Sequence, residues 1–300
     1  MKSLKHNNER LLLVVNPVAG KGRGKSILFE LVSRFTEYGY TVTVIPTCPD
    51  GKTEIAVREV AKDYDIIVAV GGDGTLNNVI NGIIKSGSGT PLGYIPLGST
   101  NDYASSLGLN RNIKDACDAI ANGTPKEIDV GAYGDDYFVY IACTGLFAET
   151  SYMTSQQLKN ALGHNAYVIK GLMSLKDTRK LYYVIHADDE RIEGDFLFVS
   201  FSNTLSAGGI IKFSDDIVKF DDGYFELSIV RAPKNIAETT ALINGLMKSR
   251  FDADVFVQKR AKRLVIECET ATGWSLDGEN GGIHETICLS VKEKAIKLIY

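Results

Sequence analysis

Three glycine-bearing segments carry the residues whose types and spacing could do chemistry, and each follows a short apolar run. They are Asn16 to Ser26, Gly71 to Asn77 and Pro96 to Tyr103. Glycine lets the backbone approach an anion closely, and a helix that starts behind such a loop directs its first N–H groups at that anion. The three segments therefore point to the binding of phosphate groups.

The first segment has a basic character, with Lys21, Arg23 and Lys25 between its glycines. Gly24-Lys25-Ser26 is the end of a P-loop signature, but Ala19 stands where the leading glycine of that signature belongs. The residues leave two interpretations open, a loop that contacts phosphate and a flexible basic turn.

The second and third segments also allow two interpretations. Asp73 could meet Mg²⁺ or its water shell, or it could cap the following helix together with Thr75. Ser99, Thr100 and Asn101 could hydrogen-bond a nucleotide or cap the next helix. Because the three segments occur at successive strand ends, together they favour a nucleotide site.

The elements that must position these loops alternate between strands and helices. Such alternation predicts a doubly wound α/β domain with a parallel sheet, whose ligands lie beyond the carboxyl ends of the strands. The predicted strands are Leu11–Val15, Thr41–Ile45, Ile66–Val70 and Leu92–Ile95, and the predicted helices include Ile27–Phe35, Lys52–Lys62 and Thr75–Lys85.

From Glu127 the pattern changes to short β-rich segments separated by turn residues, which predicts an antiparallel β-sandwich. We expect two domains, 1–126 and 127–300, and leave open that the last strand returns to the first domain. Helices are expected over Gln156–Lys176 and Ile236–Lys248. The predicted strands are Ile128–Ala132, Tyr137–Ala142, Leu181–His186, Asp195–Phe201, Tyr224–Val230, Asp254–Gln258 and Arg263–Glu267.

Composition narrows the class of protein. The formal net charge is −4, which is not that of a general nucleic-acid binder, although the first 25 residues hold six basic residues against one acid. No apolar run approaches the roughly 20 residues of a membrane span. The 5 cysteines are widely spaced and suggest neither a zinc site nor a disulfide framework. We expect a cytoplasmic protein with reduced thiols.

Five motifs in order resemble those of the diacylglycerol/lipid kinase catalytic-domain family, from about Leu11 to the C-terminus. They are Asn16 to Gly20, Gly71 to Thr75, Leu97 to Asp102, Asp221-Asp222-Gly223 and Asp277-Gly278-Glu279. The resemblance implies an ATP site in a cleft between the two domains. The nucleotide-binding residues would be Asn16, Pro17, Val18, Ala19, Gly20, Thr47, Gly71, Gly72, Asp73, Gly74, Thr75, Leu76, Asn77, Ser99, Asn101 and Asp102.

The resemblance also implies roles for acidic residues. Asp129 would join Asp73 in organising the catalytic Mg²⁺, and the sequence alone supports equally an interdomain residue at the start of a strand. Glu279 would be the general base that accepts the proton of the acceptor alcohol. Without the resemblance, the glycine-rich surroundings of Glu279 indicate a hairpin turn.

A structural metal site is a further implication. Asp222 would supply a carboxylate and Lys219 and Tyr224 their backbone carbonyls, a set of oxygen ligands suited to Mg²⁺. The preceding residues Asp215 to Val218 depart from the family's pattern, which affects the expected geometry of this loop.

The expected function is that of an ATP- and Mg²⁺-dependent lipid kinase that converts diacylglycerol to phosphatidic acid. The alternatives are an NAD kinase, a P-loop NTPase that uses Lys25, and a catalytically silent nucleotide- or lipid-binding regulator. The lipid would be reached peripherally, with transient membrane association, and a homodimer is left open. The basic residues near Leu158–Lys176 have two interpretations. They could contact an anionic membrane surface, or they could belong to an ordinary amphipathic helix packed on the sheet.

Overall fold

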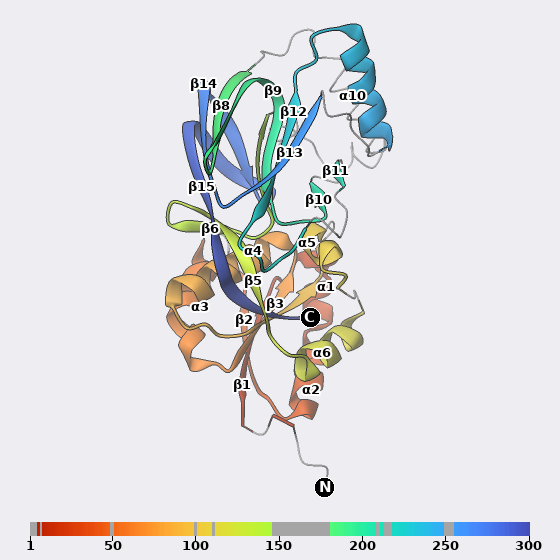
Figure 1. The fold of residues 1–300 in the computed structure, drawn as a ribbon. Coiled ribbons are helices and arrows are strands. Elements are labelled where there is room, and N and C mark those ends of the chain that lie inside the picture. The colour runs from red at the N-terminus through yellow and green to blue at the C-terminus, as the bar shows by residue number, and fades with distance from the viewer. Residues whose placement is uncertain are drawn as a thin grey trace. The chain divides into compact units, whose positions relative to one another are not determined.

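The chain forms two compact units, drawn in Figure 1. The first consists of residues 1–130 and 293–300, and the second of residues 131–292. The computed structural model describes residues 5–6, 8–48, 51–98, 101–109, 112–145, 181–207, 211–212, 218–248 and 255–300. The predicted helix Gln156–Lys176 lies outside the described residues.

A parallel sheet forms the centre of the first unit. Its four leading strands run in the order β2-β1-β3-β4, and the end of the last strand, β15, adds to β4 in parallel. Strands β3 and β4 are buried along their whole length, as expected for apolar runs covered on both faces. The predicted strands are confirmed. Their bounds are β1 Arg10–Val15, β2 Thr41–Pro46, β3 Ile66–Gly71 and β4 Leu92–Pro96.

Helices cover this sheet. Leu31 and Phe35 of α2 pack with Cys117 and Ile120 of α6 in one apolar cluster against β1, β3 and β4. Helix α3 packs closely on α4 at Gly82, where a β-carbon would lie 2.7 Å from the Val57 side chain. The bounds are α1 Ala19–Ser26, α2 Leu28–Tyr38, α3 Lys52–Val60 with the 3₁₀ turn Ala61–Asp63, α4 Asp73–Ser86, α5 Asp102–Ser106 and α6 Ile113–Asn122.

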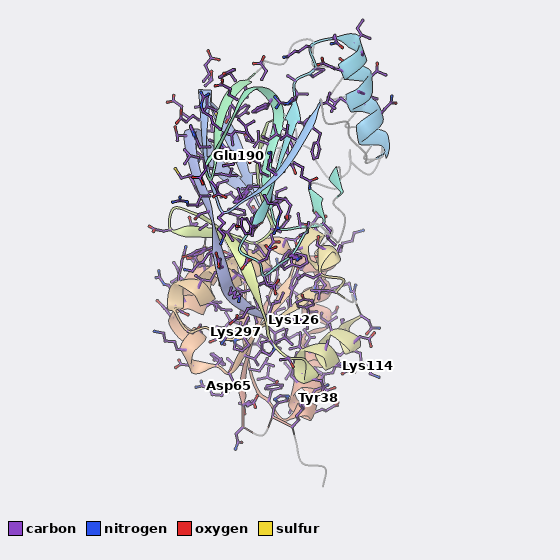
Figure 2. The ribbon with its side chains drawn as sticks, viewed as in Figure 1. Tyr38, Asp65, Lys114, Lys126, Glu190 and Lys297 are labelled. Atoms are coloured by element: carbon purple, nitrogen blue, oxygen red, sulfur yellow. The ribbon has the colours of Figure 1, made fainter. Side chains whose placement is uncertain are left out.

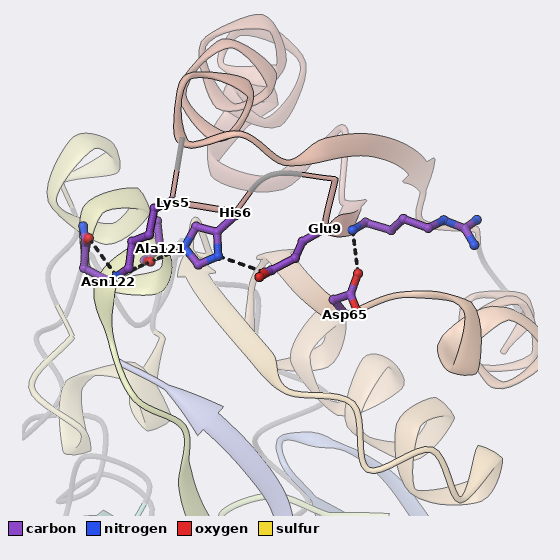
Figure 3. A network of polar contacts seen from close by, with 7 residues as sticks. Lys5, His6, Glu9, Asp65, Ala121 and Asn122 are labelled. Atoms are coloured by element: carbon purple, nitrogen blue, oxygen red, sulfur yellow. Dashed lines mark hydrogen bonds and ion pairs between the residues drawn. The ribbon is translucent and has the colours of Figure 1, made fainter. Parts of the chain in front are cut away.

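A short polar network fastens the start of the chain to the end of α6 (Figure 3). The Nζ atom of Lys5 donates to the carbonyl of Ala121 at 3.2 Å, and Nε2 of His6 lies 2.7 Å from the same carbonyl. The other ring nitrogen of His6 lies 2.8 Å from a carboxylate oxygen of Glu9. These contacts satisfy a carbonyl that the helix end leaves without an intrahelical partner.

The second unit is β-rich and antiparallel, as predicted. Its strands β14, β8, β9 and β7 pair in a closed circuit, because β7 and β8 each pair with both β9 and β14. The layers are therefore joined into a small barrel rather than left as two open sheets. Strand bounds are β6 Asp136–Phe138, β7 Ile141–Gly145, β8 Leu181–Ala187, β9 Glu190–Ser202, β10 Ser206–Ala207, β11 Ile211–Lys212, β12 Phe225–Arg231, β13 Phe256–Ala261 and β14 Arg263–Leu276.

Aromatic side chains fill the core of this barrel. Trp274, Phe138, Phe201 and Phe225 are almost entirely inaccessible to solvent, and Phe225 lies 5.2 Å from the Phe201 ring centroid. The predicted strand Tyr137–Ala142 is wrong in one respect, because it divides into β6 and β7. The predicted helix over Ile236–Lys248 is confirmed as α10.

Two long strands belong to both units. Strand β5, Lys126–Tyr133, leaves the first unit after Val130, and β15, Glu279–Ile299, enters it at Glu293. Within the first unit, Nζ of Lys126, labelled in Figure 2, lies 4.1 Å from the ring centroid of Tyr300. None of the helices in the described part of the chain is long and apolar enough to cross a membrane.

Candidate nucleotide site and associated residues

The three predicted loops meet at one edge of the first unit's sheet. Backbone hydrogen bonds connect neighbouring strand ends: Leu97 N donates to Gly71 O at 2.7 Å and Asn16 N donates to Val70 O at 2.8 Å. On the far side of β1, Thr47 N donates to Val15 O at 2.8 Å. Because these strands are parallel, the segments after all four lie side by side at the carboxyl edge.

The order of the strands identifies the centre of this edge. The chain passes from β1 to β2 on one side and then to β3 on the other side of β1. In doubly wound sheets, ligands bind in the crevice where the winding reverses, beyond the carboxyl ends of the strands. Here that position lies between the segments that begin at Asn16 and Gly71.

The side chain of Asn16 connects the loops after β1 and β3 at this position. Its Oδ1 atom accepts the backbone N–H of Val18 at 3.0 Å, which shapes the start of the first loop. Its Nδ2 atom donates to the hydroxyl of Thr75 at 3.4 Å, in the first turn of α4. One amide side chain therefore links the loops after β1 and β3.

Glycines bring the loops into backbone contact. A β-carbon on Gly98 would lie 2.7 Å from the α-carbon of Gly72, closer than two carbon atoms can approach. A β-carbon on Gly20 would lie 2.9 Å from the carbonyl oxygen of Leu97, and Gly20 has a left-handed φ of 60°. The first and second loops each need glycine where they contact the segment after β4.

The first loop has a kinked backbone. Residues 19–26 form α1, and left-handed torsions at Gly20, Lys21 and Gly22 interrupt it. Lys25 and Ser26 therefore lie in the single helical turn that follows the kink and precedes α2, Leu28–Tyr38. The segment still departs from a P-loop at Ala19, where the leading glycine of that signature belongs.

Helix α4 begins at the centre of the edge. Gly72 is its N-cap, so Asp73 and Thr75 lie inside the first turn of the helix and not at the N-cap position. Instead, Oδ2 of Asp73 accepts the backbone N–H of Asp102 at 3.2 Å, which links the loops after β3 and β4. A half-exposed helix N-terminus with a glycine cap can receive a phosphate group.

The remaining predicted nucleotide residues differ in their surroundings. Asn101 is buried with a left-handed φ of 52°, and its Nδ2 atom donates to Gly98 O at 2.8 Å, so its amide shapes the third loop. Leu76 is buried in the core, and the Oδ1 atom of Asn77 accepts a hydrogen bond from Asn81. Pro17, Val18, Ala19 and Gly74 are at least partly accessible at the edge, whereas Ser99 lies outside the described residues.

Asp129 has a structural contact in the first unit. Its carboxylate is fully buried, and Oδ1 accepts the backbone N–H of Lys294 at 2.7 Å. Lys294 has a left-handed φ of 49°, so this bond fixes β15 where its backbone departs from the extended form. The role of Asp129 toward Mg²⁺ remains a proposal.

Glu279 follows a tight hairpin turn in the second unit. Asp277 and Gly278 have φ angles of 51° and 82°, the left-handed pair of a two-residue hairpin, and Leu276 pairs with Glu279 across it. Glu279 is exposed. The turn interpretation is therefore confirmed, and the same turn holds Glu279 in a defined position.

Asp277 was not among the predicted site residues, although it anchors this hairpin. Its buried carboxylate accepts the backbone N–H groups of Val139 at 2.5 Å, Tyr140 at 2.9 Å and Ile141 at 3.1 Å. Its own N–H donates to Ile141 O at 2.8 Å. The Asp-Gly pair signals a turn in the sequence, but the partners lie more than 130 residues away along the chain.

The predicted structural metal ligands lie in the second unit just before β12. Oδ1 of Asp222 accepts the backbone N–H of Tyr224 at 3.1 Å, and Oδ2 forms an ion pair with Nη2 of Arg260. Both carboxylate oxygens thus have protein partners, and one of these is already a cation. The resemblance implies a resident Mg²⁺ here, but these carboxylate contacts do not fit one.

Glu226 is a second carboxylate beside Arg260. It is fully buried on β12, and burial raises its pKa to about 8, against the opposing effect of the Arg260 guanidinium. The Nε atom of Arg260 lies 3.6 Å from Oε1 of Glu226. Neither Glu226 nor Arg260 was predicted to matter, since only strand register brings Glu226, Arg260 and Asp222 together.

Comparisons with known proteins agree with this fold and these loops. The chain can be superposed over its full length on 98% of a solved candidate diacylglycerol kinase from Bacillus anthracis str. Sterne, with a TM-score of 0.83 and 26% identity. The chain is therefore similar to proteins that combine an α/β unit with a following β-rich unit.

Sequence comparisons identify the family. Residues 10–133 match the model of the diacylglycerol kinase catalytic domain. Diacylglycerol kinase of Bacillus subtilis (strain 168) is 32% identical over 92% of this chain and 91% of its own length. That of Staphylococcus saprophyticus is 34% identical over 91% and 90%, respectively. The chain belongs to the diacylglycerol kinase catalytic-domain family.

Proposed function

We propose that this chain is an ATP- and Mg²⁺-dependent lipid kinase that phosphorylates the hydroxyl group of diacylglycerol and yields phosphatidic acid. One observation carries the proposal, the set of backbone hydrogen bonds that joins the three glycine loops along one sheet edge. The names of the relatives support the choice of lipid.

ATP would bind in the first unit, at the crevice between β1 and β3. The first turn of α4 and the loop that Asn16 shapes would receive its phosphates through backbone N–H groups. Glycine at positions 20, 72 and 98 keeps the loops close enough to act on one ligand. Phosphoryl transfer depends mainly on such positioning and on charge stabilisation.

Mg²⁺ would arrive with ATP as part of the co-substrate. Asp73 is the acidic residue of the first turn of α4, where a carboxylate can meet the ion or its water shell. Asp129 would assist through the charge of its carboxylate. Its Oδ1 atom accepts the backbone N–H of Lys294.

In the transfer step, the acceptor hydroxyl oxygen would form a bond to the γ-phosphorus while the bond to the β,γ-bridging oxygen breaks and ADP leaves. The proton of the hydroxyl group would pass to the Glu279 carboxylate. Support for this assignment comes from the hairpin geometry, since Asp277 holds the turn that precedes Glu279. The lipid would be reached peripherally, at a membrane surface.

An acceptor panel tests the proposal. Purified protein with labelled ATP and Mg²⁺ is offered mixed micelles of diacylglycerol, phosphatidylglycerol, sphingosine or undecaprenol, and NAD in a parallel reaction. We expect label in phosphatidic acid. Label in NADP alone would contradict a lipid kinase, and nucleotide binding with no labelled product would favour a silent regulator.

A further inference from the structure

In the second unit, an arginine pairs with the carboxylate that the resemblance assigns to a metal ion. Asp222 Oδ2 pairs with Nη2 of Arg260, which extends from the neighbouring strand β13. The loop and the strand are far apart in sequence, but β12 and β13 pair so that Glu226 lies opposite Arg260. The contact is therefore set by the register of the sheet.

Arg260 has a second role that keeps it at this position. Glu226 is fully buried, and the ion pair at 3.6 Å to Nε of Arg260 is its only ion pair within the described residues. The guanidinium of Arg260 thus contacts both Asp222 and Glu226, and the two contacts together hold it at this position.

The surroundings of Asp222 are already positively charged. The guanidinium carbon of Arg260 lies 5.0 Å from the ring centroid of Tyr224, and Nζ of Lys262 lies 4.9 Å from the same centroid. Tyr224 is one of the residues whose carbonyl was predicted to bind the metal. A divalent cation at Asp222 would meet the guanidinium of Arg260 at short range, beside a turn whose Tyr224 ring already contacts two positive side chains.

The remaining oxygen of Asp222 is used within its own turn. Oδ1 accepts the N–H of Tyr224 at 3.1 Å, the two-residue pattern by which aspartate stabilises a turn. Gly223 has a left-handed φ of 76°, which the turn requires between these residues. The turn is therefore closed by protein groups on both carboxylate oxygens.

We propose that Arg260 is the resident cation of the Asp222 turn, and that the second unit holds this turn without a divalent metal ion. The proposal is independent of the kinase reaction and of the Mg²⁺ that accompanies ATP. It predicts a turn whose stability depends on residue 260 and not on the metal content of the solution.

Metal binding tests this proposal directly, with Mn²⁺ as the probe and without nucleotide. Free Mn²⁺ is measured by electron paramagnetic resonance during titration of the wild-type chain and of Asp222→Asn. We expect equal numbers of bound Mn²⁺ in the two proteins, because Asp222 binds none. One additional Mn²⁺ in the wild type would overturn the proposal.

Arg260→Gln tests the replacement itself. Removal of the guanidinium should free Asp222, so this variant should bind one more Mn²⁺ than the wild type, and Arg260→Gln/Asp222→Asn should lose that ion again. An Arg260→Gln variant that gains no ion would overturn the role of Arg260. Lys259→Gln is the matched control, because Lys259 is the adjacent exposed residue of β13 and pairs with Glu190 instead.

Thermal unfolding provides a second readout, which does not depend on counting bound ions. The midpoint for the wild type should be the same in EDTA and in millimolar Mg²⁺. A fall in EDTA that Asp222→Asn abolishes would contradict the proposal. Arg260→Gln should unfold at a lower temperature than the wild type in EDTA and recover at least part of the difference on addition of Mg²⁺.

Discussion

Gly72 and Gly98 touch through their backbones, at the ends of adjacent parallel strands. A β-carbon on Gly98 would lie 2.7 Å from the α-carbon of Gly72, and one on Gly72 would lie 3.3 Å from that of Gly98. The loops after β3 and β4 can approach each other this closely because both positions lack a side chain.

Gly98→Ala should separate these loops. The clash is with Oδ1 of Asn101 at 2.6 Å and with the Gly72 backbone at 2.7 Å. We therefore expect a loss of about 1–3 kcal/mol in the free energy of unfolding and a raised KM for ATP. Urea unfolding and initial-rate kinetics measure the two effects. Gly108→Ala is the control for the KM: alanine is strained there by the left-handed φ of 67°, but its β-carbon meets open space and no neighbouring loop. Equal KM values for the two variants would contradict the contact.

Asn16→Asp should weaken ATP binding. Asp retains an acceptor for Val18 N–H but cannot donate to Thr75, and it places a negative charge beside the proposed phosphate site. We expect the KM for ATP to rise at least about tenfold, or about 1.4 kcal/mol. Asn112→Asp is a matched control, because Asn112 caps α6, where Asp serves equally well. An unchanged KM for Asn16→Asp would place the nucleotide elsewhere.

Substitution of Asp277 should affect stability, whereas substitution of Glu279 should affect the reaction rate. Asp277→Asn weakens three charge-assisted hydrogen bonds and should lower the free energy of unfolding by about 1.5–3 kcal/mol. Glu279→Gln should leave stability unchanged and lower kcat by about 10²–10⁴. Chemical denaturation and steady-state kinetics on both variants distinguish these roles. Full turnover by Glu279→Gln would remove the proposed base.

Cys117 should be unreactive in the folded protein. Burial raises its pKa to about 12 from an ordinary value of 9.0, so at pH 8 only about one thiol in ten thousand is the reactive thiolate. Cys48 and Cys288 are exposed and should react first with a disulfide reagent, as mass spectrometry of labelled peptides would show. Labelling of Cys117 as fast as Cys288 would contradict the burial.

The raised pKa of Cys117 also makes the free energy of unfolding depend on pH. The folded state holds the thiol proton more tightly than the unfolded state, so the contribution is complete below about pH 9 and is lost as the pH rises toward 12. The free energy of unfolding should fall more steeply above pH 9 for the wild type than for Cys117→Ala, by at most about 1.4 kcal/mol per pH unit. Parallel curves would contradict this linkage.

Local patterns predict the first unit well. Runs such as Leu11–Val15 and Ile66–Val70 can be satisfied only where both faces of a strand are covered, so they identify the parallel sheet and its carboxyl edge. The glycine content of residues 19–26 favours a loop, and the left-handed torsions at Gly20, Lys21 and Gly22 do interrupt α1. The helical turn that follows Gly22 and leads into α2 is not indicated by local propensity.

The second unit shows what local patterns miss. Strand β15 carries Lys292, Glu293 and Lys294 in its middle, so no apolar run reveals it. Asp277 and Arg260 act on backbone or side chains that are distant in sequence, and their partners depend on strand register. Such long-range contacts can be recognised only from the structure.

Phosphate transfer to diacylglycerol tests the central claim most directly. The wild-type chain is incubated with Mg²⁺, a short-chain diacylglycerol in mixed micelles, and ATP labelled on either the γ- or the α-phosphate. We predict labelled phosphatidic acid from γ-labelled ATP only, and its loss in Asp73→Asn. No labelled lipid from either form of ATP, in a protein that remains folded, would contradict the account.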